Sequence, residues 1–466
     1  MTKNEPENLK KNGIGLLAAT TLGVVMLSPA MTLYGGFGPA YLNAGAAAPL
    51  AFVWALLATL PTAVSYIVLS KHHPCAGSAA GWAARAFSKN VGIWAGWMVL
   101  LYYLTNFVIQ PVTLGVFAGD LLHYVHVTPG FITFSAGALL CLLLSAAFVY
   151  RGLSSSSHGA LVFLGIETCV VVVLCASVLW YAQAGGATFS TAGFSLASSP
   201  QGSSGVFRAM VFAILAFCGF DVVSTLAEET RDPEKNIPRA TILALVVYAG
   251  VIIAGIWALT YGASADEIKK IAESGQMPIS ELARRVWGWG GVLIPITGLS
   301  AALGLAIATS IGSSRVLFSM SRSGSAPKIF SVLSSQGTPR NALHAIFGVG
   351  LVSSLLTAAL LGPFESYVWW GTTSTFFAMI TYVLVNGSNL ILNRSRLREG
   401  IGAIFLFALI PILGLSIDLY LLYRTFFVEL WTQGWATGKS VVVFDSICCL
   451  VAMFVAFRSR DQGVSS

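Results

Sequence analysis

One acidic residue, Glu167, lies within an apolar stretch at residues 158–183. It follows the start of that stretch by about nine residues, which is ~14 Å along a helix at 1.5 Å per residue. A charge at this depth of a membrane is costly, so an ionisable residue there is expected to be functional. We interpret Glu167 as a residue that takes up a proton or pairs with a cation. The structural alternative is a protonated glutamate that hydrogen-bonds to a neighbouring helix.

A second acidic residue, Asp221, ends the sequence Phe217-Cys-Gly-Phe-Asp221 in the middle of another apolar stretch, 205–228. An aspartate after such an interruption is suited to cap the half-helix that follows. Contact with a bound solute and a purely structural cap both remain open for Asp221. Tyr102 and Tyr103, in the stretch at 91–122, are candidates for lining the same cavity, although aromatic residues in membrane helices often only pack.

A matching interruption, Leu27-Ser-Pro-Ala-Met-Thr-Leu-Tyr-Gly-Gly-Phe-Gly38, occurs in the apolar stretch at 13–42. Its proline removes one helical hydrogen bond, and three glycines follow. Unwound backbone frees N–H and C=O groups within the membrane, and paired interruptions in two successive units point to a binding site. Two simple kinks are the alternative, since Gly and Pro are common in membrane helices. The predicted solute-binding residues are Ser28, Ala30, Met31, Thr32, Gly35, Tyr102, Tyr103, Phe217, Cys218, Gly219, Phe220 and Asp221.

The whole chain is too apolar for a soluble protein of 466 residues, because 56% of it is hydrophobic and only 10% is charged. A helix needs about 20 apolar residues to cross the hydrocarbon core. Stretches of this kind lie at 13–42, 46–70, 91–122, 129–149, 158–183, 205–228, 238–262, 290–320, 343–361, 366–392, 400–423 and 437–457. The sequence therefore predicts an all-α membrane protein with about 12 transmembrane helices.

Basic residues are distributed unequally between the gaps that separate these stretches. An even number of spans places both termini on one side, and 19 of the 26 Lys and Arg residues share that side. Because cytoplasmic loops carry the excess of Lys and Arg, both termini are predicted to be cytoplasmic. At the cytoplasmic end of the sixth span, an inner-gate ion network is expected among Glu228, Glu229, Arg231 and Arg239.

The loop at 263–290 is predicted to lie outside and to begin a short charged helix at the capping box Ser264-Ala-Asp-Glu267. A solvated surface helix and a lid over the outer entrance are the two interpretations of this loop. Asp120 and Asp418 lie near the predicted outer ends of their spans, where a water-facing structural role is expected. His123 and His126 share a helix face but have no further metal ligands nearby in the sequence.

The sequence lacks the motifs that are typical of several other classes of protein. The seven cysteines show no disulfide or zinc spacing, and most lie in apolar stretches. No HExxH or GxSxG motif supports an enzyme. The basic residues lie in short gaps rather than in a stripe that would bind nucleic acid. We therefore expect no metal, no cofactor, no enzymatic activity and no nucleic-acid partner, with the lipid bilayer as the surroundings.

Three segments resemble the amino acid–polyamine–organocation superfamily of transporters. The sixth span and the turn after it are similar through Phe217-Cys-Gly-Phe-Asp221, Ala227-Glu-Glu-Thr-Arg-Asp-Pro233 and Ile237-Pro-Arg-Ala240. The loop after span eight is similar through Arg315-Val-Leu-Phe-Ser-Met-Ser-Arg-Ser-Gly324, followed by Pro327-Lys328 and Thr338-Pro339. The segment between spans two and three is similar through Pro74-Cys-Ala-Gly-Ser78 and Gly96-Trp97. These segments occur in the order expected for the family.

The resemblance implies a five-plus-five inverted repeat with broken helices 1 and 6, and a central site between spans 1, 3, 6, 8 and 10. The expected organisation is a tail at 1–12, a ten-helix transport core at 13–392, two accessory helices at 400–457 and a tail at 458–466. Within the core, the two repeats are expected at 13–183 and 205–392.

The resemblance does not decide between an amine and an amino acid as the substrate. The first break is most similar to putrescine and polyamine importers, whose Pro-Met-Thr-Leu-aromatic segment is nearly matched by Pro-Ala-Met31-Thr32-Leu33-Tyr34. Amino acid members usually carry Gly-small-Gly at the positions of Ala30, Met31 and Thr32. Tyr102 occupies a position that is acidic in some polyamine importers, which counts against a polyamine. Many members have a lysine near the position of Glu167 in place of a bound sodium, and a glutamate suits a proton carrier better.

The function implied is secondary active import of a small amine, polyamine or amino acid by alternating access, coupled to a proton or to sodium, in the cell (inner) membrane. An α-amino acid permease or exchanger is the first alternative. A nutrient sensor built on a transporter fold is an alternative from a different class.

Overall fold

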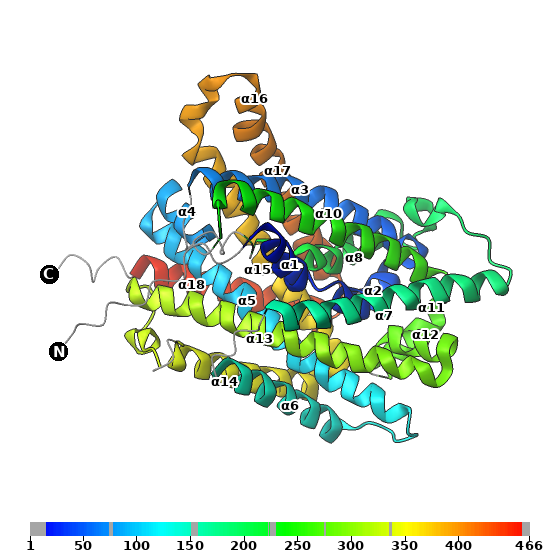
Figure 1. Ribbon diagram of the computed structural model, residues 1–466. Coiled ribbons are helices and arrows are strands. Elements are labelled where there is room, and N and C mark those ends of the chain that lie inside the picture. The colour runs from blue at the N-terminus through cyan, green and yellow to red at the C-terminus, as the bar shows by residue number, and fades with distance from the viewer. Residues whose placement is uncertain are drawn as a thin grey trace.

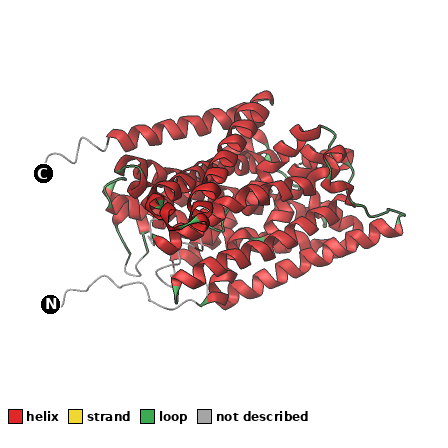
Figure 2. Ribbon diagram, turned by 90° about the horizontal axis from the view of Figure 1, so that it is seen from above, coloured by secondary structure: helices red, strands yellow, loops and turns green. Residues whose placement is uncertain are grey.

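The structure, a computed structural model, describes residues 15–73, 78–150, 157–221, 223, 230–274, 276–334 and 338–458. The secondary structure in these ranges is helical, and no strand occurs among its elements (Figure 2). Ten helical stretches within them are long and apolar enough to cross a membrane. Large apolar side chains such as Ile132, Leu360 and Ile401 are exposed on the outside of the bundle, as lipid contact requires. The predicted all-α membrane fold is confirmed.

Most long helices run side by side, and short elements gather at the two ends of the bundle (Figure 1). Helix α4 (Ser78–Ala86) and the end of α18 (Ser440–Arg458) lie at one end, which we call the α4 end. Helices α11 (Ala265–Glu273) and α12 (Pro278–Trp287) lie at the other, the α12 end. The predicted short charged helix is α11, and its capping box places the Ser264 hydroxyl 3.5 Å from a Glu267 oxygen.

The first apolar stretch forms two helices, α1 (Leu16–Leu27) and α2 (Pro29–Ala44), with Ser28 between them. Since a proline has no N–H, α2 begins where the hydrogen bonds of α1 must stop. A 3₁₀ turn, Gly45–Ala47, then leads into α3 (Ala48–His72). The helix break thus lies where the sequence predicted it.

Helix α5 (Lys89–His123) forms the centre of the bundle. It packs against α6 (Phe131–Tyr150), α13 (Leu293–Arg322) and α15 (Pro363–Leu392). Small residues permit this close approach, as is usual between membrane helices. A Cβ atom at Gly298 of α13 would lie 2.5 Å from the ring of Phe117 on α5.

Four further long helices surround this centre. They are α7 (Ser157–Ala184), α8 (Gly202–Phe217), α10 (Pro233–Thr260) and α14 (Arg340–Leu361). Helix α8 packs against α2 and α3, whereas α7 packs against α10 and α13. Helix α8 ends at Phe217, and residues 218–221 form a turn, so the second break also lies where it was predicted.

The last part of the chain packs directly on the core. Helices α16 (Ile401–Ile404) and α17 (Ile410–Leu422) are joined by the π-helical segment Phe405–Leu409, and a second π-helical segment, Tyr423–Glu429, follows. Helix α17 contacts α3 and α15, and α18 contacts α5 and α15. The remaining 3₁₀ turns are Thr191–Phe194, Leu196–Ser198, Gly288–Val292, Lys328–Ser331, Arg394–Glu399 and Leu430–Thr432, and Trp435–Lys439 is a third π-helical segment.

Candidate functional site

The first break leaves backbone donors inside the bundle. Ser28 adopts a left-handed φ of 42°, a conformation that a non-glycine residue holds only when its surroundings enforce it. Ala30 and Met31 lie in the first turn of α2, where N–H groups have no acceptor within their own helix, and both residues are buried. Free N–H groups at a helix N-terminus favour an anionic group such as a carboxylate.

The hydroxyl of Thr32 connects the first break to the second. It donates to the hydroxyl of Tyr248 on α10 at 2.6 Å, because the single Tyr248 proton is donated to the Ala216 carbonyl at 2.5 Å. Ala216 lies in the last turn of α8, directly before the second break. Thr32, predicted as a solute contact, is therefore held in a bridge between α2, α10 and α8.

Asp221 is the charged residue of the second break. Its side chain is 6% exposed, and its Oδ2 atom accepts a hydrogen bond from the Tyr103 hydroxyl of α5 at 3.1 Å. Its Oδ1 atom accepts one from the Gly219 N–H at 3.1 Å, and Gly219 has a φ of 119°, which only glycine adopts without strain. The turn thus donates a backbone hydrogen bond to the Asp221 carboxylate, which also contacts α5 through Tyr103.

Aromatic rings enclose this carboxylate. The ring of Phe220 lies edge-on to Tyr66 of α3 at 5.4 Å and tilted to Tyr382 of α15 at 5.6 Å, measured between centroids. Tyr102 and Tyr103 are both buried, with ring centroids 4.9 Å apart. Aromatic faces in a site with a carboxylate attract organic cations. The predicted residues Phe217 and Cys218 are buried in the same core.

Gly35 of α2 allows close approach between α2 and α15. A Cβ atom there would overlap the hydroxyl and ring of Tyr367. Gly35 was predicted as a solute contact, and the structure shows that packing requires a glycine there. Tyr367 is the side chain that lies against Gly35, beside the first break.

Glu167 lies on α7, and its side chain is 6% exposed. The hydroxyl of Ser300 on α13 is its hydrogen-bonding neighbour. Tyr34 of α2 lies within electrostatic range of the carboxylate, and the Tyr34 hydroxyl is 2.6 Å from that of Thr297, one turn before Ser300. Neither an arginine nor a lysine pairs with Glu167 among the described residues. The structure therefore places Glu167 beside the α2–α13 contact rather than against the second break.

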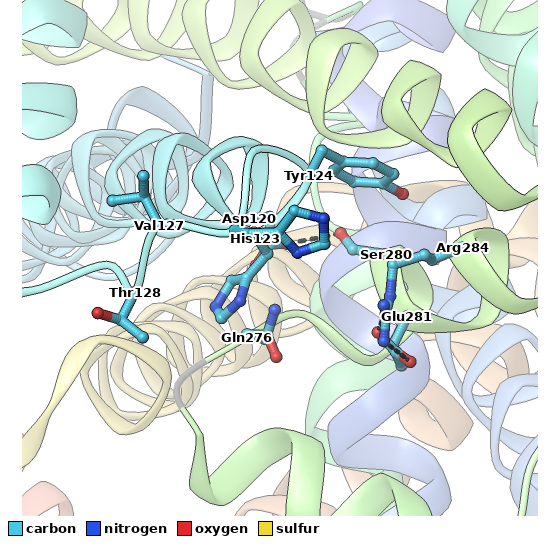
Figure 3. A pocket seen from close by; sticks show the side chains of 10 residues that line it. Asp120, His123, Tyr124, Val127, Thr128, Gln276, Ser280, Glu281 and Arg284 are labelled. Carbon is cyan, nitrogen blue, oxygen red and sulfur yellow. Dashed lines mark hydrogen bonds and ion pairs between the residues drawn. The ribbon is translucent and has the colours of Figure 1, made fainter.

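The expectation that Asp120 faces water is wrong. Its side chain is 2% exposed, and its Oδ2 atom accepts a hydrogen bond of 2.5 Å from Ser280 in the first turn of α12. A negative charge near a helix N-terminus is favourable, which explains the burial. Figure 3 shows this contact at the edge of a cavity of about 240 Å³, which His123 and Arg284 also line.

The expectation that Asp418 faces water is also wrong. Its side chain is 4% exposed, and it accepts hydrogen bonds from Thr62 of α3 and Asn386 of α15. The apolar residues on either side of Asp418 correctly predicted that it lies within a helix, α17. They did not reveal that α17 turns its one acidic residue towards the core.

Part of the predicted inner gate lies outside the described residues. Glu228 and Glu229 belong to that part, as do most residues of the segment 74–78. Arg231 and Arg239 are described, and both are exposed near the start of α10. The inner-gate network stays a prediction.

Four residues near the breaks were missed by the sequence reasoning: Tyr66, Tyr248, Tyr367 and Tyr382. Tyr66 lies on α3, Tyr248 on α10, and Tyr367 and Tyr382 both lie on α15. None of them matches a motif, so local sequence held no signal for it. All four tyrosines are buried near the breaks. A buried tyrosine hydroxyl usually needs a hydrogen-bond partner.

Known proteins match the chain over most of its length. A family model described as amino acid permease matches residues 14–455. A low-affinity putrescine importer, PlaP, of Escherichia coli K12 is 26% identical over 341 residues, or 71% of each chain. A branched-chain amino acid permease, BcaP, of Lactococcus lactis is 24% identical over 79% of this chain and 78% of its own. An L-methionine/branched-chain amino acid exporter, YjeH, of Escherichia coli K12 is 25% identical over 86% of this chain and 90% of its own.

Proposed function

The chain belongs to the amino acid permease family and is a transporter rather than an enzyme, and from this premise we propose that it imports a small solute with an amino group by alternating access. The observation that carries the proposal is the buried Asp221 carboxylate, which lies in a helix break and is enclosed by aromatic rings. An ammonium group is the natural partner of such a carboxylate. The similarity to a putrescine importer supports an amine as the first candidate.

A zwitterionic amino acid is the second candidate, and a different observation favours it. The first-turn N–H groups of Ala30 and Met31 suit an α-carboxylate, while Asp221 suits the α-ammonium group. Met31 adds bulk where amino acid members usually have a small residue, which opposes close approach to this backbone. The similarity to branched-chain amino acid permeases supports this candidate.

Coupling to protons is proposed through Glu167. A carboxylate that lies in apolar surroundings without an ion pair among the described residues favours its neutral form. It would take up a proton on one side of the membrane and release it when the α2–α13 contact opens to water. Sodium remains the alternative coupling ion, and symport the proposed mode.

The cell membrane is the proposed location, with both termini in the cytoplasm. The excess of Lys and Arg at the α4 end supports this orientation. In the same orientation α11 and α12 face outwards, and the inner-gate residues Arg231 and Arg239 face inwards.

The experiment that tests the function is uptake into proteoliposomes loaded with purified protein. The panel contains radiolabelled putrescine, ethanolamine, isoleucine and methionine, each with and without an inward proton gradient. We expect uptake of an amine that rises with the gradient, and Asp221→Asn should reduce it at least tenfold. If isoleucine or methionine is carried while the amines neither move nor compete, the amine assignment is wrong and the second candidate stands. Binding without flux for every compound would identify a sensor.

A further inference from the structure

Asp418 of α17 is a buried carboxylate outside the two breaks. Its Oδ2 atom accepts a hydrogen bond of 3.0 Å from the Thr62 hydroxyl and one of 2.9 Å from the Asn386 amide. The same Asn386 amide donates its second hydrogen to the Thr62 oxygen at 2.8 Å. Three helices, α3, α15 and α17, thus converge on one charge.

A chain of hydrogen bonds continues from this point to the α4 end. The Ser65 hydroxyl donates to the Asn386 carbonyl oxygen at 2.6 Å, and the Asn389 amide donates to Ser65 at 3.1 Å. The Asn393 amide donates to the Asn389 oxygen at 2.8 Å. Finally, Nε2 of His73 lies 3.2 Å from the Asn393 oxygen, to which it donates. His73 is the residue directly after α3, and its carbonyl accepts a hydrogen bond from Trp82 of α4.

Every donor in this chain is directed towards Asp418. Each asparagine uses its oxygen on the His73 side and its amide N–H on the Asp418 side, so reversing any one amide would break two bonds. Aligned hydrogen bonds polarise one another, and a row of donors directed at a carboxylate stabilises its negative charge.

This arrangement exceeds what anchoring α17 would need. Apolar residues of similar size anchor a helix at least as well as a buried charge, whose desolvation is costly. No arginine or lysine pairs with Asp418 among the described residues. The carboxylate is therefore stabilised by neutral donors alone, a state from which a single proton can remove the charge.

The chain also touches the second break through its neighbours. Tyr66 follows Ser65 on α3, and Tyr382 lies one turn before Asn386 on α15. These two rings contact each other at 6.1 Å, and both contact Phe220. Tyr66 and Tyr382 thus connect the contact between α3 and α15 at Asp418 with Phe220, the residue before Asp221.

We propose that Asp418 is a proton-binding residue of the transport cycle, stabilised in its ionised form from the α4 end by this chain, and that its protonation changes the packing of α3 and α15 against the second break. The proposal rests on the transport function proposed above. The proton binds one Asp418 carboxyl oxygen and converts the carboxylate to a neutral acid. No proton travels along the amides, which carry only the electrostatic influence.

Other titratable groups that face this region are few. Tyr66 on α3, and Cys218 and Asp221 at the second break, lie within electrostatic range of one another or of Asp418. Tyr382 on α15 lies beside them. At the α4 end, Lys71 and His72 precede His73 on α3, and Arg396 follows α15 in the turn Arg394–Glu399. Asp221 is the group whose titration must be separated from that of Asp418.

The test uses the full-length protein in lipid nanodiscs and needs no substrate. Infrared difference spectra between acidic and alkaline buffer report each carboxyl group that gains a proton. We expect one carboxyl band to disappear in Asp418→Asn and to persist in Asp221→Asn. Thr62→Val removes a donor, so the same band should titrate about one pH unit higher, a tenfold change in proton affinity. A matched control, Thr59→Val, removes a buried hydroxyl of α3 that is bonded only to the Ala55 carbonyl of its own helix, and should leave the band unchanged.

Hydrogen–deuterium exchange at one pH tests the link to the break. Asp418→Asn imitates the neutral acid, so exchange around 214–221 should change several-fold relative to the wild type, and Thr59→Val should not change it. Asn389→Leu interrupts the chain of hydrogen bonds but keeps Asp418, so it replaces Asp418→Asn as the test variant if Asp418→Asn does not fold. In Asn389→Leu, as in Thr62→Val, the carboxyl band should titrate at a higher pH. A wild-type infrared band in Asp418→Asn, or wild-type exchange at the break, overturns the proposal.

Proteoliposomes then separate the two proposals. Where the wild type carries putrescine or isoleucine, Asp418→Asn should flatten the dependence of uptake on the internal pH. If the wild type carries no compound of the panel, the transport function fails, while the infrared and exchange results still decide whether Asp418 binds a proton.

Discussion

At the scale of single residues, the membrane interior of this protein holds carboxylates in different surroundings. Glu167 has a serine hydroxyl beside it, Asp221 accepts from a tyrosine and a backbone N–H, and Asp418 accepts from a threonine and an asparagine. Each added donor favours the ionised form. Glu167 is the least supported of the three, so it is the best suited to gain and lose a proton during transport.

Replacing Glu167 by glutamine tests this role. The glutamine keeps the shape and a hydrogen-bonding oxygen for Ser300 but cannot titrate. We expect Glu167→Gln to abolish or flatten the pH dependence of uptake, measured in proteoliposomes across acidic and alkaline external buffer. Full activity with an unchanged pH profile would leave Glu167 as a structural residue.

Tyr103 positions the carboxylate of Asp221 through a single hydrogen bond of 3.1 Å. Tyr103→Phe removes that donor and leaves the ring in place. A lost hydrogen bond to a charged group costs about 1.5–3 kcal/mol, so substrate affinity should fall roughly 10- to 100-fold in equilibrium binding. Tyr102→Phe is the matched control, since the Tyr102 side chain donates no hydrogen bond among the described contacts. An equal loss in both variants would contradict a specific role for Tyr103.

At the scale of elements, the site consists of two helices that stop inside the membrane. The first stops because Pro29 cannot donate, and the second stops at Cys218, whose backbone is extended, before Gly219 turns the chain with a positive φ. The Thr32–Tyr248–Ala216 bridge then fixes one break relative to the other. Opening one side of the protein must therefore move α10 together with both half-helices, or break this bridge.

Gly219→Leu tests the importance of the second break. A leucine is strained at a φ of 119° and would move the N–H that Asp221 accepts from. We expect binding of the transported solute to be lost while the protein still inserts and stays monodisperse in detergent. Gly304→Leu on α13 is the control, because a side chain at Gly304 meets open space. If Gly304→Leu loses binding to the same extent, the second break is not the binding site.

At the scale of the whole molecule, the last two long helices pack against the other helices of the bundle. Besides the Asp418 contacts, Glu429 after α17 pairs with Arg208 of α8 at 3.0 Å and with Arg424 at 2.7 Å, and accepts from Ser204 of α8 at 2.5 Å. Helix α8 is the half-helix that leads to the second break. The π-helical segment after α17 thus holds the start of α8 through Glu429, while Asp418 of α17 contacts α3 and α15.

Truncating Glu429 should destabilise the protein because it leaves two arginines without their shared partner. The Glu429 side chain is 4% exposed, whereas Arg208 and Arg424 are partly exposed, so we expect a loss of about 1–3 kcal/mol for Glu429→Ala. Thermal unfolding of the purified protein measures it. Glu399→Ala, which removes an exposed pair with Arg396, should change the melting temperature little. Equal effects would show that burial of Glu429 does not matter.

Much of the architecture could be predicted from the sequence because it depends on local properties. Long apolar stretches must be helices in a membrane, since each backbone group needs a partner within its own segment. Pro29 interrupts the first helix because it lacks an N–H, and Gly219 permits the positive φ that the second break uses. The helix breaks and the short helix α11 were therefore found at or close to their predicted positions. Ten helical stretches among the described residues are long and apolar enough to cross a membrane, against about twelve predicted.

Only the tertiary structure decided what each polar side chain faces. Asp120 and Asp418 were expected in water because their positions along the spans suggested it, but α12 and the pair α3–α15 cover them. The partners of Thr32 and Asp418 lie 216 and 356 residues away in the chain. A side chain's position along an apolar helix does not tell which neighbour packs on that face, because this is set by how the small residues of all the helices fit together. The sequence alone determined where the helices stop, and the packing determined which charges they enclose.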